Sequence, residues 1–234
     1  MLELTEWHDI VTLVEDEARA LLEKLHIRKP PVDAFVLAKA LDLTVHIDTN
    51  LSTRGYSRKR WGIETVTVGS KNPAKSERKH FTIAHEIGEM LLAGKVKQSL
   101  LEDASNHMAV SLLLPRDRFH KDADALEFDL LALKKRYSTV SHEVIAYRML
   151  DFKSLIITIF DNSKLYRRKS SYPNRLRRIK HISPLEMECM EAVSDRAEQV
   201  LLKDDEKSVT GWPIFRDNWK RVILKTELKD VISD

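Results

Sequence analysis

Apolar residues in the first part of the chain recur every three or four positions, which is the spacing of one face of an α-helix. The clearest example is residues 6–25. Its apolar positions are Ile10, Leu13, Val14, Ala18, Leu21, Leu22 and Leu25. We expect this helix to end before Pro30 and Pro31, because consecutive prolines cannot continue a helix. Residues 32–41 then predict a shorter helix with Asp33 near its start.

The middle of the chain changes from helical periodicity to alternation and back. Residues 43–48 and 65–70 alternate like strands, and the basic stretch between them, residues 52–62, is interpreted as a polar loop or hairpin. Four further helices are predicted after these strands. They cover residues 77–93, 101–114, 128–137 and 141–150, and Pro115 closes the second of them.

The last third of the chain mixes strands with one helix. Strands are predicted at residues 155–160 and 219–228, with an amphipathic helix at 184–202 between them. The pattern as a whole predicts an α+β fold in three parts. These are a mainly helical domain with a small sheet (1–125), a helix-turn-helix-like pair of helices packed on it (126–150), and a small α+β domain that senses a signal or docks a partner (151–234).

Composition narrows the class of protein without naming a function. A chain of 234 residues with 43% hydrophobic residues can bury a core, and a net charge of +3 is too small to indicate a nucleic-acid partner by itself. The single cysteine, Cys189, excludes a disulfide within the chain and a cysteine-rich zinc site, and is interpreted as a core residue. No secretory signal and no apolar stretch long enough for a membrane span is visible, which predicts a cytoplasmic protein without membrane contact.

The sequence HEIGE at residues 85–89 is the first candidate for chemistry. His85 and Glu89 are four residues apart, so on a helix they share one face and can reach one ion. Glu86 follows His85, where it could hold a water and take its proton as a general base. Gly88 weakens the helix, which indicates that another element packs closely there. The alternative is an ordinary amphipathic helix with a pair of surface carboxylates.

Four segments in order resemble the bacterial ImmA/IrrE metallopeptidase family. They are PPVDAFVLAKALDLTV, RKHFTIAHEIGEMLL, LEDASNHMAVSLLLP and FDLLALKKRYSTVSHEVIAYRML. The resemblance spans roughly residues 8–150 and implies a zincin-like fold, with one metal ion held by the motif helix and by an acidic residue on the next helix. It also implies a substrate: known members cut helix-turn-helix repressors and so release genes for mobile-element transfer or DNA-damage responses.

Transferring the family's roles residue by residue makes His85 the first ligand, Glu89 the second and Glu86 the general base. The family pattern around Asn106 points to Glu102, four residues earlier, as the third ligand.

Two other residues on the same helix could take the place of Glu102. Asp103 is the alternative acidic ligand, and His107 could reach the ion if the helix were rotated. An ordinary polar role for His107 is also open.

Glu89 departs from the usual pattern, in which a second histidine stands at this position. Two carboxylates make the set neutral with Zn²⁺, so the ion would polarise a carbonyl less and lower the pKa of a bound water less. More oxygen ligands also favour harder ions such as Mn²⁺. We therefore expect Zn²⁺ or Mn²⁺, weaker or less selective binding, and slow or absent hydrolysis.

Residues 164–180 hold eight basic residues and no acidic one. The candidate contacts to nucleic acid or to a protein partner are Arg167, Arg168, Arg177 and Arg178. A weak DNA contact would follow the phosphate backbone, whereas a solvated loop or a flexible connector needs no partner. The preceding pair of helices has helix-turn-helix dimensions, but its apolar positions favour packing.

Three functions remain open from the sequence. The first is an endopeptidase that cuts a helix-turn-helix repressor through a water held at the ion and activated by Glu86. The second is a catalytically impaired relative that binds and regulates such a repressor or an antitoxin-like partner. The third is a nucleic-acid-binding regulator that uses residues 164–180.

Overall fold

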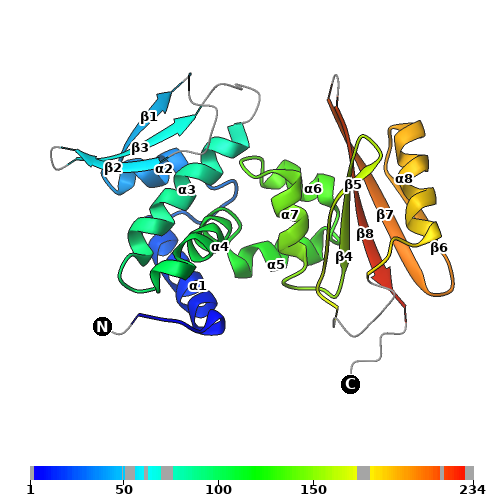
Figure 1. Cartoon of the computed structure of the whole chain (residues 1–234), viewed down its shortest axis with the longest axis horizontal. Helices are drawn as coiled ribbons and strands as arrows, with labels where there is room; N and C mark the ends of the chain where they lie inside the picture. Colours follow the sequence, from blue (N-terminus) through cyan, green and yellow to red (C-terminus); the bar gives the residue numbers. More distant parts are fainter. Residues whose placement is uncertain are drawn as a thin grey trace. The chain divides into compact units, whose positions relative to one another are not determined.

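The computed structural model describes residues 3–48, 50, 56–60, 63–69, 76–172, 180–216 and 219–229. The chain is α+β, as predicted, and divides into two compact units, Met1–Ser141 and His142–Asp234 (Figure 1). Within the described residues no helix combines the length and the apolar character needed to cross a membrane.

Unit 1 carries six of the described α-helices and a small sheet. Its elements are α1 (Trp7–Lys24), α2 (Ala34–Ala40), β1 (Thr44–Asp48), β2 (Tyr56–Arg60), β3 (Ile63–Gly69), α3 (Ser76–Leu92), a 3₁₀ turn (Gln98–Leu100), α4 (Leu101–Leu113), α5 (Arg116–Ala125) and α6 (Leu130–Arg136). The strand order is β1-β3-β2, with β1 parallel and β2 antiparallel to β3. The described part of residues 52–62 is therefore one arm of a hairpin.

Two local interactions fix the second helix of unit 1. Asp33 caps α2, because its side chain accepts a hydrogen bond of 2.8 Å from the backbone N–H of Phe35. Nδ1 of His80, near the start of α3, accepts a bond of 3.2 Å from the backbone N–H of Ala34. The bond joins α2 to the helix that carries the motif.

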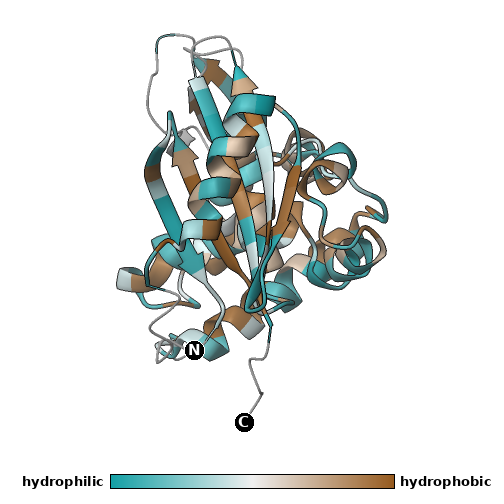
Figure 2. Cartoon of the chain, turned by 90° about the vertical axis from the view of Figure 1, so that its right-hand side faces the viewer, coloured by the Kyte–Doolittle hydropathy of each residue, from teal (hydrophilic) through white to brown (hydrophobic). Residues whose placement is uncertain are grey.

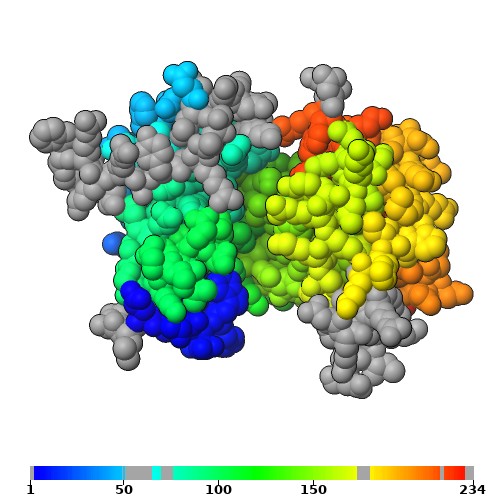
Figure 3. Space-filling model, viewed as in Figure 1, coloured from blue at the N-terminus to red at the C-terminus, as the bar shows by residue number. Residues whose placement is uncertain are grey.

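The helices of unit 1 pack around α4, which contacts both α1 and α3. Figure 3 shows α1 (blue) at the surface beside the green segment that contains α4. The inner face of α3 is apolar and fully buried at Ile83, Ala84 and Ile87. This burial holds the motif helix in place.

Helix α5 is absent from the sequence prediction. Its buried positions are only Phe119, Asp122 and Ala123, so it has no continuous apolar stripe to reveal it. Asp122 accepts hydrogen bonds from Arg136 and Tyr137, which satisfy its buried carboxylate. The helix is held by these tertiary contacts, and they are invisible in its own periodicity.

Unit 2 is a five-stranded antiparallel sheet with helices. Its elements are α7 (His142–Met149), β4 (Ile156–Asp161), β5 (Lys164–Ser170), α8 (Pro184–Arg196), β6 (Val200–Lys203), β7 (Lys207–Arg216) and β8 (Trp219–Leu228). The strand order is β5-β4-β8-β7-β6. Figure 2 shows α8 lying across one face of this sheet, with hydrophilic residues on much of its outer side.

Two predictions for unit 2 were wrong. The helix predicted at 184–202 ends at Arg196, because Ala197 adopts a left-handed backbone with φ of 54°, and β6 follows. The prediction also missed strand β7, which contains Gly211 and Pro213 in its interior. Proline is tolerated there because the pairing with β6 ends at Gly211, so beyond it the strand has a partner only on the β8 side.

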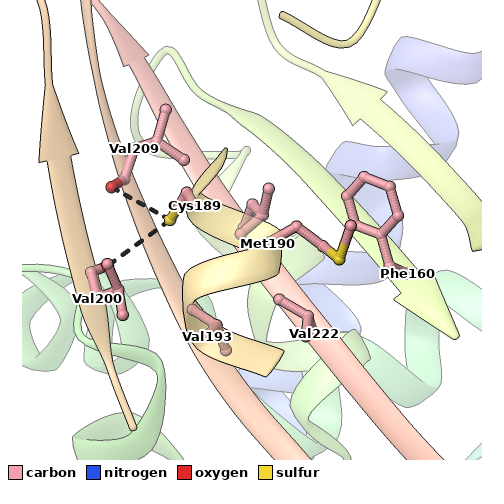
Figure 4. Packing of buried hydrophobic residues seen from close by; sticks show 8 residues of the cluster. Phe160, Cys189, Met190, Val193, Val200, Val209 and Val222 are labelled. Atoms are coloured by element: carbon pink, nitrogen blue, oxygen red, sulfur yellow. Dashed lines mark hydrogen bonds between the residues drawn. The ribbon is translucent and has the colours of Figure 1, made fainter. Parts of the chain in front are cut away.

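The core of unit 2 lies between α8 and the sheet (Figure 4). Cys189 is fully buried, and its Sγ lies 3.8 Å from the carbonyl oxygens of Val200 and Val209. Burial raises the pKa of this thiol to about 12. A Cβ on Gly211 would lie 3.0 Å from Sγ and 2.7 Å from Val193, so the glycine lets the helix approach the strand. Cys189 is a core residue, as expected.

The predicted pair of helices at 126–150 corresponds to α6 and α7, and the division after Ser141 places them in different units. Helix α7 buries Ile145, Ala146, Arg148 and Met149. The three-part organisation with a helix-turn-helix-like pair stays a prediction.

Candidate metal centre

The motif helix presents His85 and Glu89 on one face. Helical spacing brings the Nε2 atom of His85 and Oε1 of Glu89 to 3.5 Å. The imidazole is 12% exposed and the carboxylate 35%, so this end of the pair is open to solvent. The predicted sharing of one face by these two side chains is confirmed.

The third member of the cluster comes from α4. Oε2 of Glu102 lies 3.5 Å from His85 Nε2, and the side chain is 55% exposed. This approach depends on Gly88, where an added Cβ would lie 2.9 Å from Cβ of Met108 and 3.2 Å from Cα of Ser105. The close packing predicted at Gly88 is therefore confirmed: α4 crosses α3 at a point where α3 has no side chain, and Met108 of α4 packs there.

These three side chains have the spacing of a ligand set. Ligand atoms of His85, Glu89 and Glu102 all lie within 4.8 Å of one another, and they form the only such group of three found among the described residues. In a tetrahedral site with bonds of about 2.0–2.2 Å, neighbouring ligand atoms are about 3.3–3.6 Å apart. The two separations from His85 of 3.5 Å fall in that range, and the spacing of the three donors is compatible with one divalent ion.

The second nitrogen of His85 also has a partner. Nδ1 lies 3.1 Å from Oδ1 of Asn106, which stands one turn after Glu102 on α4. From the sequence, Asn106 served only to locate Glu102, and no role was predicted for it. Its spacing of four residues from a predicted ligand is the signal that could have identified it.

Residues 42–150 match the sequence model of the IrrE N-terminal-like domain, a peptidase family. The match contains the motif helix, Glu102 and Asn106. These residues are therefore similar to an IrrE N-terminal-like domain. The resemblance inferred from the sequence is confirmed for them, and the family is one of metallopeptidases, which implies a divalent metal ion.

This chain is also similar to a solved structure, that of a Mycobacterium tuberculosis transcriptional regulator. The TM-score is 0.63 at 16% identity, and the alignment covers 94% of this chain and 76% of the other. At this identity the similarity shows the fold. No curated protein matches the chain.

Three other predicted residues of the IrrE N-terminal-like domain lie around the cluster. Glu86 is 4% exposed on α3. Asp103 is exposed and is not part of the cluster. His107 is directed at α1: its Nε2 lies 3.4 Å from Oε1 of Glu15, and its ring packs edge-on against Trp7. The structure thus assembles Glu102, rather than Asp103 or His107, with His85.

The basic run lies outside the IrrE N-terminal-like domain. Residues 164–170 form the edge strand β5, so the interpretation as a loop or connector was wrong for this part. Arg168 is 11% exposed and forms a bidentate ion pair with Glu186, with N–O distances of 2.7 and 3.2 Å. Arg167 is 53% exposed. Arg177 and Arg178 lie outside the described residues.

Proposed function

We propose that this protein is a metal-dependent endopeptidase that cuts a regulatory protein. The observation that carries the proposal is the convergence of His85, Glu89 and Glu102 from two helices, at separations that suit one divalent ion. Membership of residues 42–150 in a peptidase family supports a catalytic use of that ion.

Each residue of the site has a distinct task in this proposal. A divalent ion would supply a Lewis acid that polarises the scissile carbonyl and makes a water easier to deprotonate. His85, Glu89 and Glu102 hold the ion, and their partly exposed side chains leave access for a peptide. Glu86, which is 4% exposed on α3, takes a proton from the attacking water and returns it to the leaving amine.

The donor set bears on the identity of the ion. One imidazole and two carboxylates are compatible with Zn²⁺ and with Mn²⁺, and they neutralise the charge of either ion. We propose Zn²⁺ or Mn²⁺, with weaker polarisation of the substrate than in a site with two histidines.

The substrate we propose is a helix-turn-helix repressor. The resemblance to the ImmA/IrrE family supports this choice, and so does the fold shared with a transcriptional regulator.

The test combines metal content with hydrolysis. We expect purified protein supplied with Zn²⁺ or Mn²⁺ to hold one ion per chain, and His85→Ala and Glu102→Ala to lose it. Glu86→Gln is expected to keep the ion and lose peptide cleavage, measured by mass spectrometry on a helix-turn-helix repressor. His107→Gln is the matched control, because this residue lies on α4 and is directed at α1. Wild-type protein that binds neither ion would refute the proposal.

A second candidate function is a non-catalytic regulator on the same fold, which binds such a repressor without cutting it. Glu89 favours it, because a carboxylate in place of histidine weakens the electrophile. Stoichiometric binding of the repressor, with no cleavage by wild type in either metal, would select this function.

Nucleic-acid binding has less support. Arg168, one of the four proposed contacts, is engaged by Glu186 inside unit 2 and is not presented to a phosphate backbone. Arg167 is the better probe: DNA binding that falls steeply with salt and is weakened by Arg167→Ala would revive this function.

A further inference from the structure

Helix α4 places one side chain beside each ring nitrogen of His85. From α4, Glu102 lies 3.5 Å from Nε2 of His85, and Asn106 lies 3.1 Å from Nδ1. Because Glu102 and Asn106 are four residues apart, they stand one above the other on the helix face that meets α3. The crossing at Gly88 sets the distance of both from the imidazole.

The contact with Asn106 determines which nitrogen of His85 is available. The amide Oδ1 can only accept, so this contact is a hydrogen bond in the tautomer of His85 that carries the proton on Nδ1. In a neutral imidazole the other nitrogen, Nε2, then has a free lone pair, and it is the nitrogen that faces Glu89 and Glu102. The opposite tautomer would put a proton on Nε2 and block it as a ligand.

We propose that Asn106 is a positioning residue, which holds His85 in the tautomer and ring orientation that direct its Nε2 lone pair to the ion. The part of this inference that concerns metal rests on the proposed function, whereas the part that concerns the tautomer holds for the metal-free protein. Partners of this kind fix the orientation of a metal-ligating histidine and raise its basicity.

The chemistry of an amide suits this site better than that of a carboxylate. Glu89 and Glu102 already neutralise a divalent ion, so a third carboxylate at position 106 would make the site negative. A neutral acceptor orients the imidazole without adding charge.

The experiment uses the full chain with Asn106→Leu, which is similar in size and has no acceptor, and Asn106→Asp, which keeps the acceptor. His107→Gln is the matched control, because it changes the next residue of α4. Zn²⁺ affinity is measured by competition with a chromophoric chelator, and the tautomer of His85 by ¹⁵N NMR of the metal-free protein at a pH where imidazole is neutral. Thermal unfolding without metal reports on the fold.

We expect Asn106→Leu to lower Zn²⁺ affinity about 10–100-fold while the metal-free melting temperature stays near that of His107→Gln. The NMR signal of a proton on Nδ1 should be present in wild type and in Asn106→Asp and lost in Asn106→Leu, and Asn106→Asp should retain most of the affinity. If Asn106→Leu does not fold, Asn106→Ser, whose hydroxyl is too short to reach, takes its place.

Two results would overturn the inference. A proton on Nε2 in metal-free wild type would do so directly. An Asn106→Leu variant that melts earlier but keeps the wild-type tautomer and affinity would show a structural role only. Because the tautomer is read without metal, a wild type that binds no ion would end the proposed peptidase function and leave this measurement decisive for Asn106.

Discussion

Two regions of the molecule bring ionisable side chains together with different results. One is the crossing of α3 and α4, and the other is the clamp, the ion pair of Arg168 on β5 with Glu186 on α8. At the crossing, His85 meets Glu89 and Glu102, and all three keep some exposure. At the clamp, Arg168 meets Glu186, and both side chains are almost completely buried. In both regions a glycine lets a helix come close, Gly88 in the first and Gly211 in the second.

The difference lies in which partners surround the charges. Glu186 also caps α8 with Ser183 and accepts a hydrogen bond of 2.9 Å from Thr226, so its carboxylate is satisfied from several sides within the protein. At the candidate metal site the two groups that lie 3.5 Å from Nε2 of His85 are the carboxylates of Glu89 and Glu102. Removing one member of the buried pair is costly to the fold, whereas one imidazole beside two carboxylates has the donor composition of a divalent-metal site.

The largest effect is expected from opening the clamp. Arg168→Ala leaves the buried carboxylate of Glu186 without its cation, which should cost about 3–5 kcal/mol in the free energy of unfolding. Urea denaturation followed by circular dichroism measures this loss. Arg167→Ala is the control, because its exposed side chain should contribute less than about 1 kcal/mol. Equal losses in the two variants would remove the distinction between clamp and surface.

A smaller change at the crossing should affect both fold and site. Gly88→Ala forces α4 away from α3, so we expect a loss of about 1–3 kcal/mol together with weaker Zn²⁺ binding, because Glu102 moves away from His85. Chemical denaturation and chelator competition measure the two effects. Adding Met108→Gly removes both the Cβ at 2.9 Å and the Cγ at 3.1 Å and should restore part of the affinity; no recovery would mean that the spacing of the helices does not control the site.

Glu89→His tests the charge of the site without disturbing the clamp. A second imidazole in place of a carboxylate should raise Zn²⁺ affinity relative to Mn²⁺, by about tenfold, which corresponds to about 1.4 kcal/mol. Competition titrations with both ions measure the change. His85→Ala in the same background should abolish the gain, and an unchanged preference would contradict the proposed coordination.

The two regions should also respond to acid at different pH. Burial lowers the pKa of His80, at the start of α3, below its usual 6.5, so the folded state resists protonation and unit 1 loses stability as the pH falls below 6.5. Burial alone would raise the pKa of Glu186, but hydrogen bonds from Arg168 and Ser183 hold it below 4.5, and its contribution is lost only as the pH falls below that value.

Urea denaturation between pH 4 and 8 separates the two windows. His80→Asn keeps an acceptor for the Ala34 N–H and cannot take up the proton, so it should flatten the loss below pH 6.5. Glu186→Gln should leave that first window unchanged. A first loss of stability that persists in His80→Asn would assign it to another group.

The sequence predicted most reliably what helical periodicity controls. The spacing of His85 and Glu89, the close packing at Gly88 and the cap at Asp33 follow from positions within one helix. What depended on a partner distant in sequence was not predictable: the contact of Asn106 with Nδ1 joins residues on two helices, and strand β7 is defined by its pairing on both sides. The run of basic residues grouped Arg167 and Arg168 as equivalent contacts, which composition alone cannot separate. On strand β5 these neighbours face opposite sides of the sheet, and only Arg168 meets α8.

The rate at which Cys189 is alkylated measures how often α8 separates from the sheet. A thiol whose pKa is raised to about 12 is almost entirely protonated at neutral pH and inert to alkylating reagents. Reaction must therefore wait until α8 lifts from the sheet, and the rate of labelling reports how often that happens. Because Cys189 is the single cysteine in the sequence, alkylation reports on this residue alone. The local opening of unit 2 can therefore be followed in the wild-type protein.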